Sequence, residues 1–226
     1  MSKFTSVQPQ LFFIPGETTT GSVELFPAVW NAAQELVSPQ LDNRQKALED
    51  LVSLEAVRLS PLVAYLVASR LEEPDISLRA KITATLADVL GPDGLGRPAP
   101  EQVRSYLIAF LGHIRQSAVE AVLEVVLEDS ELRGRISRLF NFSPGVGRHL
   151  AKILADRSKT LEIRRQAADF IGLVGFVEAA PTLERLRNRL EARQSGQSSM
   201  PFAPPSGSDE AQLLPALTTA LTLLRS

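Results

Sequence analysis

The sequence has no cysteine, only two histidines, and few aromatic residues, with Phe, Trp and Tyr making up 6% of the chain. Without cysteine the chain cannot form a disulfide bond, a thiolate metal site or a catalytic thiol, and the composition suits a reducing compartment. We therefore expect a cytoplasmic protein. His113 and His149 have no second histidine one helical turn away, so a metal site there would lack a ligand set. We predict no metal and no other cofactor.

Other features of catalytic sites are also missing. Serines such as Ser143 and Ser206 have neither a glycine elbow nor a plausible histidine partner, which argues against nucleophilic catalysis. The glycines of "GPDGLGRPAP" (residues 91–100) lack the Lys-Ser/Thr ending and the preceding strand of a phosphate-binding loop. We interpret this stretch as a loop between two helices, and we predict that the protein is not an enzyme.

The remaining composition is that of a soluble folded protein. The chain has 226 residues, of which 44% are hydrophobic and 22% charged, and its net charge is −2. A chain of this length buries most of its apolar surface on folding. The longest apolar run, around Leu62 to Ala68, is far shorter than the ~18 residues that cross a bilayer, so we expect no transmembrane segment.

A pattern recurs four times along the chain, each time as an arginine that opens an amphipathic segment. The copies begin at Arg44, Arg79, Arg115 and Arg164. Apolar residues stand three, seven and ten positions later: Ala47, Leu51, Leu54; Ile82, Leu86, Val89; Ala118, Val122, Val125; and Ala167, Ile171, Val174. Because these offsets trace one face of a helix, each copy is predicted to be a helix with one buried face.

A second helix is predicted to follow each of these. Pro61 and Pro181 both stand seventeen residues beyond their arginine, and proline suits the first turn of a helix, so helices are expected over 61–71 and 181–192. The arginines are 35, 36 and 49 residues apart, which is typical of helical hairpins with one enlarged unit. We place the enlargement between Glu131 and Asn141, as a short extra helix before one over 144–156.

The segments "PDISLRAKITATLADVL" and "SKTLEIRRQAADFIGLVG" resemble the first helices of HEAT repeats, and the resemblance covers about residues 37–192. It implies an all-α, right-handed α-solenoid of about four to five helical hairpins. In that family an Asp before the helix and an Arg inside it form a ladder, which Asp42 with Arg44 and Asp75 with Arg79 match. The third copy has no acid just ahead of Arg115, and the fourth offers Glu162 instead.

Four segments follow from this interpretation. We predict an extended N-terminal arm over 1–22, a HEAT-like solenoid over 23–193, a flexible linker over 194–209 and a C-terminal capping helix over 210–226. The solenoid is expected to begin with a helix that starts near Glu24 or Pro27 and ends near Val37. Repeat arrays need caps at both ends, because an uncapped unit leaves its apolar face in water.

Charge is unevenly distributed. Residues 133–193 hold thirteen lysines and arginines against six acids, a net charge of +7, which leaves −9 for the rest of the chain. These cations either form solvated faces partly neutralised by Glu184 and Glu191, or they attract phosphates or an acidic protein surface. A nucleic-acid partner is less favoured, because the net charge of the whole chain is slightly acidic.

We therefore expect a non-enzymatic scaffold for protein–protein interaction, or an accessory subunit of a larger assembly, that binds through the concave surface of the solenoid. From the family pattern, the residues expected on that surface are Tyr65, Arg70, Tyr106, Arg148, Lys152, Arg185 and Arg189. The arm adds the contiguous apolar residues Leu11, Phe12, Phe13 and Ile14, which either pack on the first repeat or insert into a partner as an extended peptide.

Two other functions stay open. The basic C-terminal half is compatible with binding to nucleic acid or another polyanion. Chromophore lyases of phycobiliproteins also resemble HEAT arrays, so a lyase-like maturation chaperone is the second alternative.

Overall fold

The computed structural model describes residues 22–194 and 208–225, and both ranges contain helices and turns but no strand. The all-α class predicted from the sequence is therefore confirmed for these ranges. The predicted arm residues Leu11, Phe12, Phe13 and Ile14 and most of the predicted linker lie outside the described residues.

The α-helices are α1 (Pro27–Glu35), α2 (Leu41–Ser53), α3 (Ala56–Leu59), α4 (Pro61–Ala68), α5 (Ile76–Leu90), α6 (Glu101–Gly112), α7 (Gln116–Glu128), α8 (Arg133–Asn141), α9 (Val146–Ala155), α10 (Leu161–Val174), α11 (Ala180–Gln194) and α12 (Leu214–Arg225). Short 3-10 helices are η1 (Ser22–Leu25), η2 (Ser130–Leu132), η3 (Val177–Ala179) and η4 (Ser208–Leu213).

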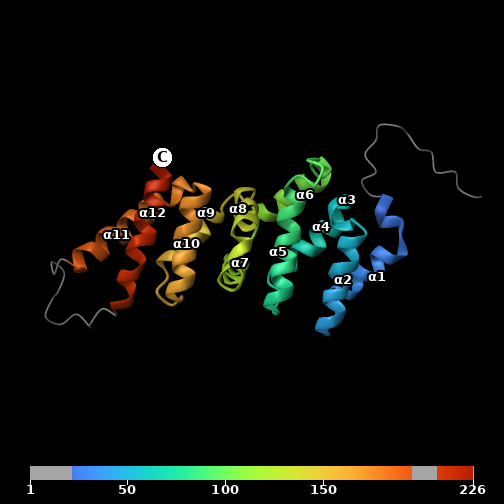
Figure 1. The fold of residues 1–226 in the computed structure, drawn as a ribbon, viewed down its shortest axis with the longest axis horizontal. Coiled ribbons are helices and arrows are strands. Elements are labelled where there is room, and N and C mark those ends of the chain that lie inside the picture. The colour runs from blue at the N-terminus through green and yellow to red at the C-terminus, as the bar shows by residue number, and fades with distance from the viewer. Residues whose placement is uncertain (1–21, 195–207, 226) are drawn as a thin grey trace, which may run out of the picture.

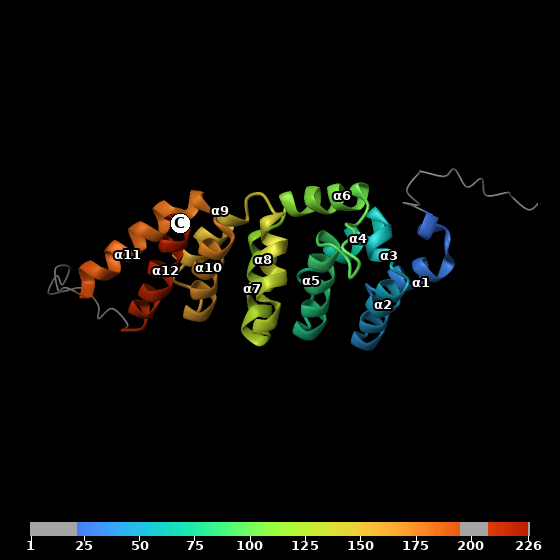
Figure 2. The same cartoon turned by 45° about the horizontal axis from the view of Figure 1, so that its top comes forward.

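The helices follow one another along the long axis of an elongated molecule, from α1 at one end to α11 and α12 at the other (Figure 1). Turned by 45°, the same ribbon shows α6, α9 and α11 along one edge and α2, α5, α7 and α10 below them (Figure 2). Neighbouring elements pack together in chain order, with α4 against α6, α5 against α7 and α8, α9 against α10, and α12 against both α10 and α11.

The apolar face predicted for each repeated helix is buried, except that Leu54 is exposed and Val174 is only partly buried. The residues three and seven positions after each arginine are all at most 6% exposed, and the four at the seventh position are completely buried. At the tenth position Leu54 is 43% exposed, so this prediction was wrong. The reason is local: α2 ends at Ser53, and Glu55 takes a left-handed φ of 54°, so Leu54 lies beyond the helix.

The predicted second helices begin at or next to their prolines. Pro61 is the first residue of α4, and the Ser60 hydroxyl caps that helix by accepting a hydrogen bond from the Val63 amide at 3.1 Å. Pro181 lies in the first turn of α11. The extra helix predicted in the enlarged unit is present as α8. The next helix, α9, begins only after Gly145, whose φ of 96° excludes it from a right-handed helix.

Three of the four arginines that open the repeated pattern contact carboxylates that lie outside their own helices. Arg44 of α2 contacts Glu73, just before α5, at 2.6 Å; Arg79 of α5 contacts Glu124 of α7 at 2.5 Å. Arg164 of α10 contacts Glu210, just before α12, at 2.9 Å. Asp75 instead caps α5 by accepting a hydrogen bond from the Leu78 amide at 2.8 Å. These ion pairs connect successive parts of the row.

The contact between α10 and α12 depends on a glycine. A Cβ atom added to Gly172 would lie 2.6 Å from the Cα of Ala220, closer than real Cβ contacts, so only glycine allows this approach. Helix α10 continues past Gly172 and ends at its C-cap, Gly175, whose φ is 87°.

We expect Gly172→Ala to lower the free energy of unfolding by about 1–2 kcal/mol, because the overpacking outweighs alanine's higher helix propensity. Gly112→Ala is the matched control, since a Cβ at Gly112 of α6 meets nothing within 4 Å. The control should leave stability unchanged or raise it slightly. Urea unfolding followed by circular dichroism measures both, and equal stability of the two variants would contradict the close contact.

Candidate partner-binding surface

A groove between α4 and α6 contains both tyrosines of the chain. We call it the aromatic groove; its volume is about 800 Å3 and its lining is mainly apolar. Tyr65 and Phe110 meet edge to face with ring centroids 5.3 Å apart. The side chains of Tyr65 and Tyr106 remain 48% and 53% exposed. The lining residues are Leu62, Tyr65, Ala68, Ser69, Leu71, Glu72, Tyr106, Ala109, Phe110, His113, Ile114, Arg115 and Ala118.

A second groove, between α9 and α11, brings together four of the cations singled out in the sequence. We call it the basic groove; its volume is about 580 Å3. On each helix two cations stand four residues apart and therefore share one face. Small alanines and Leu186 contribute its apolar surface. The lining residues are Arg148, Ala151, Lys152, Ala155, Glu178, Thr182, Arg185, Leu186 and Arg189.

The positive charge of the basic groove is largely unneutralised. Within the described residues, Arg148, Lys152 and Arg185 form no ion pair with a carboxylate, and Glu178 is the single acid of the lining. The guanidinium of Arg185 donates to the carbonyl of Pro181 on its own helix at 3.1 Å. Such a cluster produces a local positive potential that attracts anionic groups.

Of the two acids that the sequence offered as neutralising partners for residues 133–193, Glu191 does pair with one of these cations, but neither acid contacts a cation of the basic groove. Glu184 contacts Arg225 at 2.9 Å, and Glu191 contacts Arg187 at 3.5 Å. His149, beside the groove on α9, adds no charge. Burial lowers its pKa below the ordinary 6.5, and the positive charge of Lys152 lowers the pKa further, so the imidazole is neutral at pH 7.

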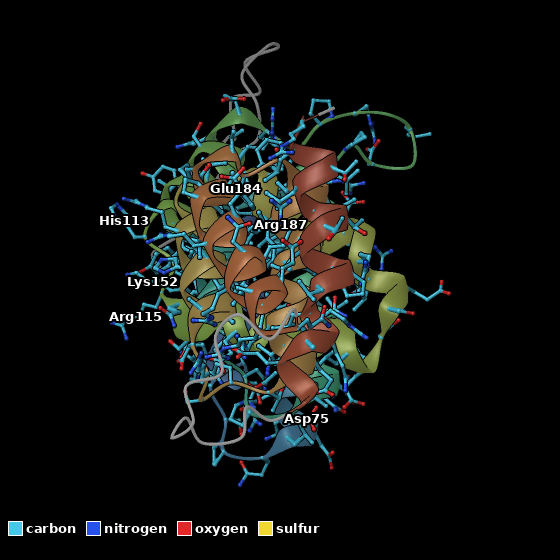
Figure 3. All side chains as sticks on the ribbon, turned by 90° about the vertical axis from the view of Figure 1, so that its left-hand side faces the viewer. Asp75, His113, Arg115, Lys152, Glu184 and Arg187 are labelled. Carbon is cyan, nitrogen blue, oxygen red and sulfur yellow. The ribbon has the colours of Figure 1, made fainter. Side chains whose placement is uncertain are left out.

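The two grooves open on the same side of the molecule. In a view along the long axis, His113 and Arg115 of the aromatic groove and Lys152 of the basic groove project to one side, whereas Asp75 lies at the lower edge (Figure 3). Helices α6 and α9 therefore present an aromatic and a basic region next to each other. The family pattern predicts one common surface for Tyr65, Tyr106 and Lys152, but not for His113 or Arg115.

Arg70, also predicted to bind a partner, forms an ion pair within the chain. Its guanidinium contacts Glu73 at 2.5 Å, and Arg44 contacts the same carboxylate at 2.6 Å. The Glu73 side chain is completely buried. Burial alone would raise its pKa, but the hydrogen bonds from Arg44 and Arg70 outweigh burial and hold the pKa below the ordinary 4.5. Arg70 lines neither groove.

A second carboxylate that the sequence did not single out collects four arginines. Glu210, at the start of the C-terminal helical segment, contacts Arg164 at 2.9 Å, Arg193 at 3.1 Å, Arg189 at 3.2 Å and Arg157 at 3.5 Å. Burial tends to raise the pKa of Glu210, whereas the hydrogen bond from Arg164 and the surrounding positive charges lower it more. Arg189 thus belongs both to the basic groove and to this cluster.

Comparison of the chain with protein-family models, with curated proteins and with solved structures found no match. In residues 22–194 and 208–225, no helix is both long enough and apolar enough to cross a membrane. The same ranges contain no group of three or more His, Asp or Glu side chains placed to hold a metal ion. The two grooves are the main chemical features on which a function can be proposed.

Proposed function

We propose that this protein is a non-enzymatic interaction scaffold or accessory subunit, built as a HEAT-like α-solenoid, that binds an acidic region of a partner protein. The observation that carries the proposal is the basic groove, where Arg148, Lys152 and Arg185 converge without a carboxylate partner among the described residues. Complementary charge on a partner would speed the encounter and favour that partner over others.

The placement of these cations favours a protein partner. Pairs at i and i+4 lie roughly 6 Å apart along a helix, a spacing that acidic residues on a partner helix reproduce. The cations stand on two packed helices, so binding would order little of the backbone. The alanines and Leu186 of the lining offer apolar contact between the charges, which suits a peptide surface.

Reversing two charges should abolish most of this binding. We expect Arg148→Glu with Arg185→Glu to weaken partner binding at least about tenfold, which corresponds to roughly 1.4 kcal/mol. Partners are first captured quantitatively from a native extract. The affinity of the captured partner for the natural protein and for the variant is then measured at several salt concentrations. The control, Lys46→Glu with Arg165→Glu, makes the same change in net charge at exposed positions outside both grooves. Equal loss in both variants would contradict a role for the groove itself.

Binding of a nucleic acid or another polyanion is the second candidate, because the same four cations could contact phosphates. The lining of the basic groove has no aromatic side chain for base stacking, which favours a protein. Single-stranded RNA and heparin are suitable probes. Four phosphate contacts would give a slope of about −3 in a plot of log affinity against log salt concentration. RNA binding with that slope, lost on reversal of Arg148 and Arg185, would replace the protein-partner proposal.

A further inference from the structure

The aromatic groove has an unusual amount of exposed apolar surface. Leu62 is 47% exposed, and it lies in the same groove as the half-exposed Tyr65 and Tyr106. Single exposed apolar residues are common on protein surfaces, but a contiguous patch marks a place that another segment covers. The groove therefore suits an occupant with large apolar side chains.

The described chain begins beside the N-terminal end of α4, the helix that forms one wall of this groove. The Glu24 carboxylate of η1 accepts a hydrogen bond from the hydroxyl of Ser60, the residue that caps α4. The indole N–H of Trp30 donates to the backbone carbonyl of Glu24 at 2.6 Å, which holds η1 in place. From Ser60, Leu62 and Tyr65 are two and five residues further along α4, or about 3 and 7.5 Å along its axis.

The chain that precedes η1 is long enough to enter the groove. Seven residues separate Ile14 from Ser22, and eight steps of extended chain span roughly 26 Å. The rise along α4 from Ser60 to Tyr65 is only about 7.5 Å. Because residues 15–21 form only a short tether, the effective concentration of Leu11–Ile14 at the groove is in the millimolar range, about that found for short flexible linkers. An intramolecular occupant is therefore favoured over a separate molecule.

We infer that the aromatic groove is the docking site of the chain's own segment Leu11–Ile14. This segment supplies four contiguous apolar side chains, two of them phenylalanines. In an extended segment alternate side chains face the same way, so Leu11 with Phe13, or Phe12 with Ile14, would enter the groove together. Their rings would meet the exposed rings of the tyrosines, a contact that aromatic residues favour. The inference is independent of the proposed function of the basic groove.

Disulfide trapping in the full chain tests the inference, because the natural sequence has no cysteine to interfere. Phe13→Cys is combined with Tyr106→Cys in the groove or, as the matched control, with Val52→Cys on α2, where Val52 is 45% exposed. In a glutathione redox buffer at low protein concentration, we expect the equilibrium constant for the intramolecular disulfide to be at least tenfold larger for the groove pair. Equal constants for the two pairs would overturn the inference.

A second measurement keeps both tyrosines intact. Phe13 is replaced by the photo-crosslinker p-benzoylphenylalanine, and the products are mapped by mass spectrometry. Cross-links within one chain to residues of α4 and α6 are expected, together with at least a fivefold loss of these products when Leu11 and Phe12 are changed to serine. Cross-links that spread over the surface, or that join two chains, would show that this segment is not the resident occupant and would sink the proposal.

Discussion

Replacing Glu73 by glutamine is expected to lower the free energy of unfolding by about 3 kcal/mol, because it leaves two arginines without their buried counter-charge. Arg44 and Arg70 are 12% and 27% exposed, and this contact with water places the loss at the lower end of the range for buried ion pairs. Urea unfolding at pH 7 gives the value. Glu72→Gln, at the adjacent residue, is the control. Because Glu72 is exposed, this substitution should change the free energy of unfolding by less than about 0.5 kcal/mol.

The pH dependence of this difference identifies its cause. The pKa of Glu73 in the folded protein lies below the ordinary 4.5, so its contribution to stability is complete above pH 4.5 and is lost as the pH falls through the lower, folded value. Glutamine does not titrate. The gap between the natural protein and Glu73→Gln should therefore shrink between pH 5 and the acid limit of folding. A gap that stays constant over this interval would mean that the carboxylate charge is not its source.

Short-range features of the fold were predictable from the sequence. The faces of the four repeated helices follow from apolar spacing, since a residue three or seven positions away lies on the same side of a helix whatever packs against it. Pro61 marked a helix start because proline acts on its own backbone. The same logic failed at Leu54, where the helix ends one residue too early for the pattern to apply.

Long-range features were only partly predictable. The four cations of the basic groove were selected from a family pattern, and their convergence depends on how α9 packs against α11. The partners of the ladder arginines were missed, because Glu73 lies in a turn and Glu210 follows the segment 195–207. The ion pair of Arg70 was missed for the same reason, since nothing in the sequence indicates that the buried Glu73 binds it. A regular spacing identifies a helix face but not the residue that will face it.

The cluster around Glu210 leads to the second large effect, the release of the C-terminal helix. Glu210 is the common ion-pair partner of four arginines, and one of them, Arg164, has a side chain only 4% exposed. In Glu210→Gln the four arginines would keep their positive charges but lose the carboxylate that each of them contacts. We expect a loss of about 3 kcal/mol, because an uncompensated buried charge costs that much.

The loss should be concentrated in α12, since Glu210 immediately precedes it while the arginines belong to the body of the molecule. Hydrogen exchange is the suitable measurement: amide protection in α12 should fall by at least about a hundredfold in Glu210→Gln, and protection in α5 should change little. Glu191→Gln is the control, because the Glu191 side chain is 56% exposed and, within the described residues, forms an ion pair only with Arg187. The folded pKa of Glu210 also lies below 4.5, so acid should release α12 in the natural protein but have no such effect through position 210 in the variant. Uniform loss of protection along the whole chain would instead show that α12 unfolds together with the rest, and that the arginine cluster stabilises the molecule as one unit.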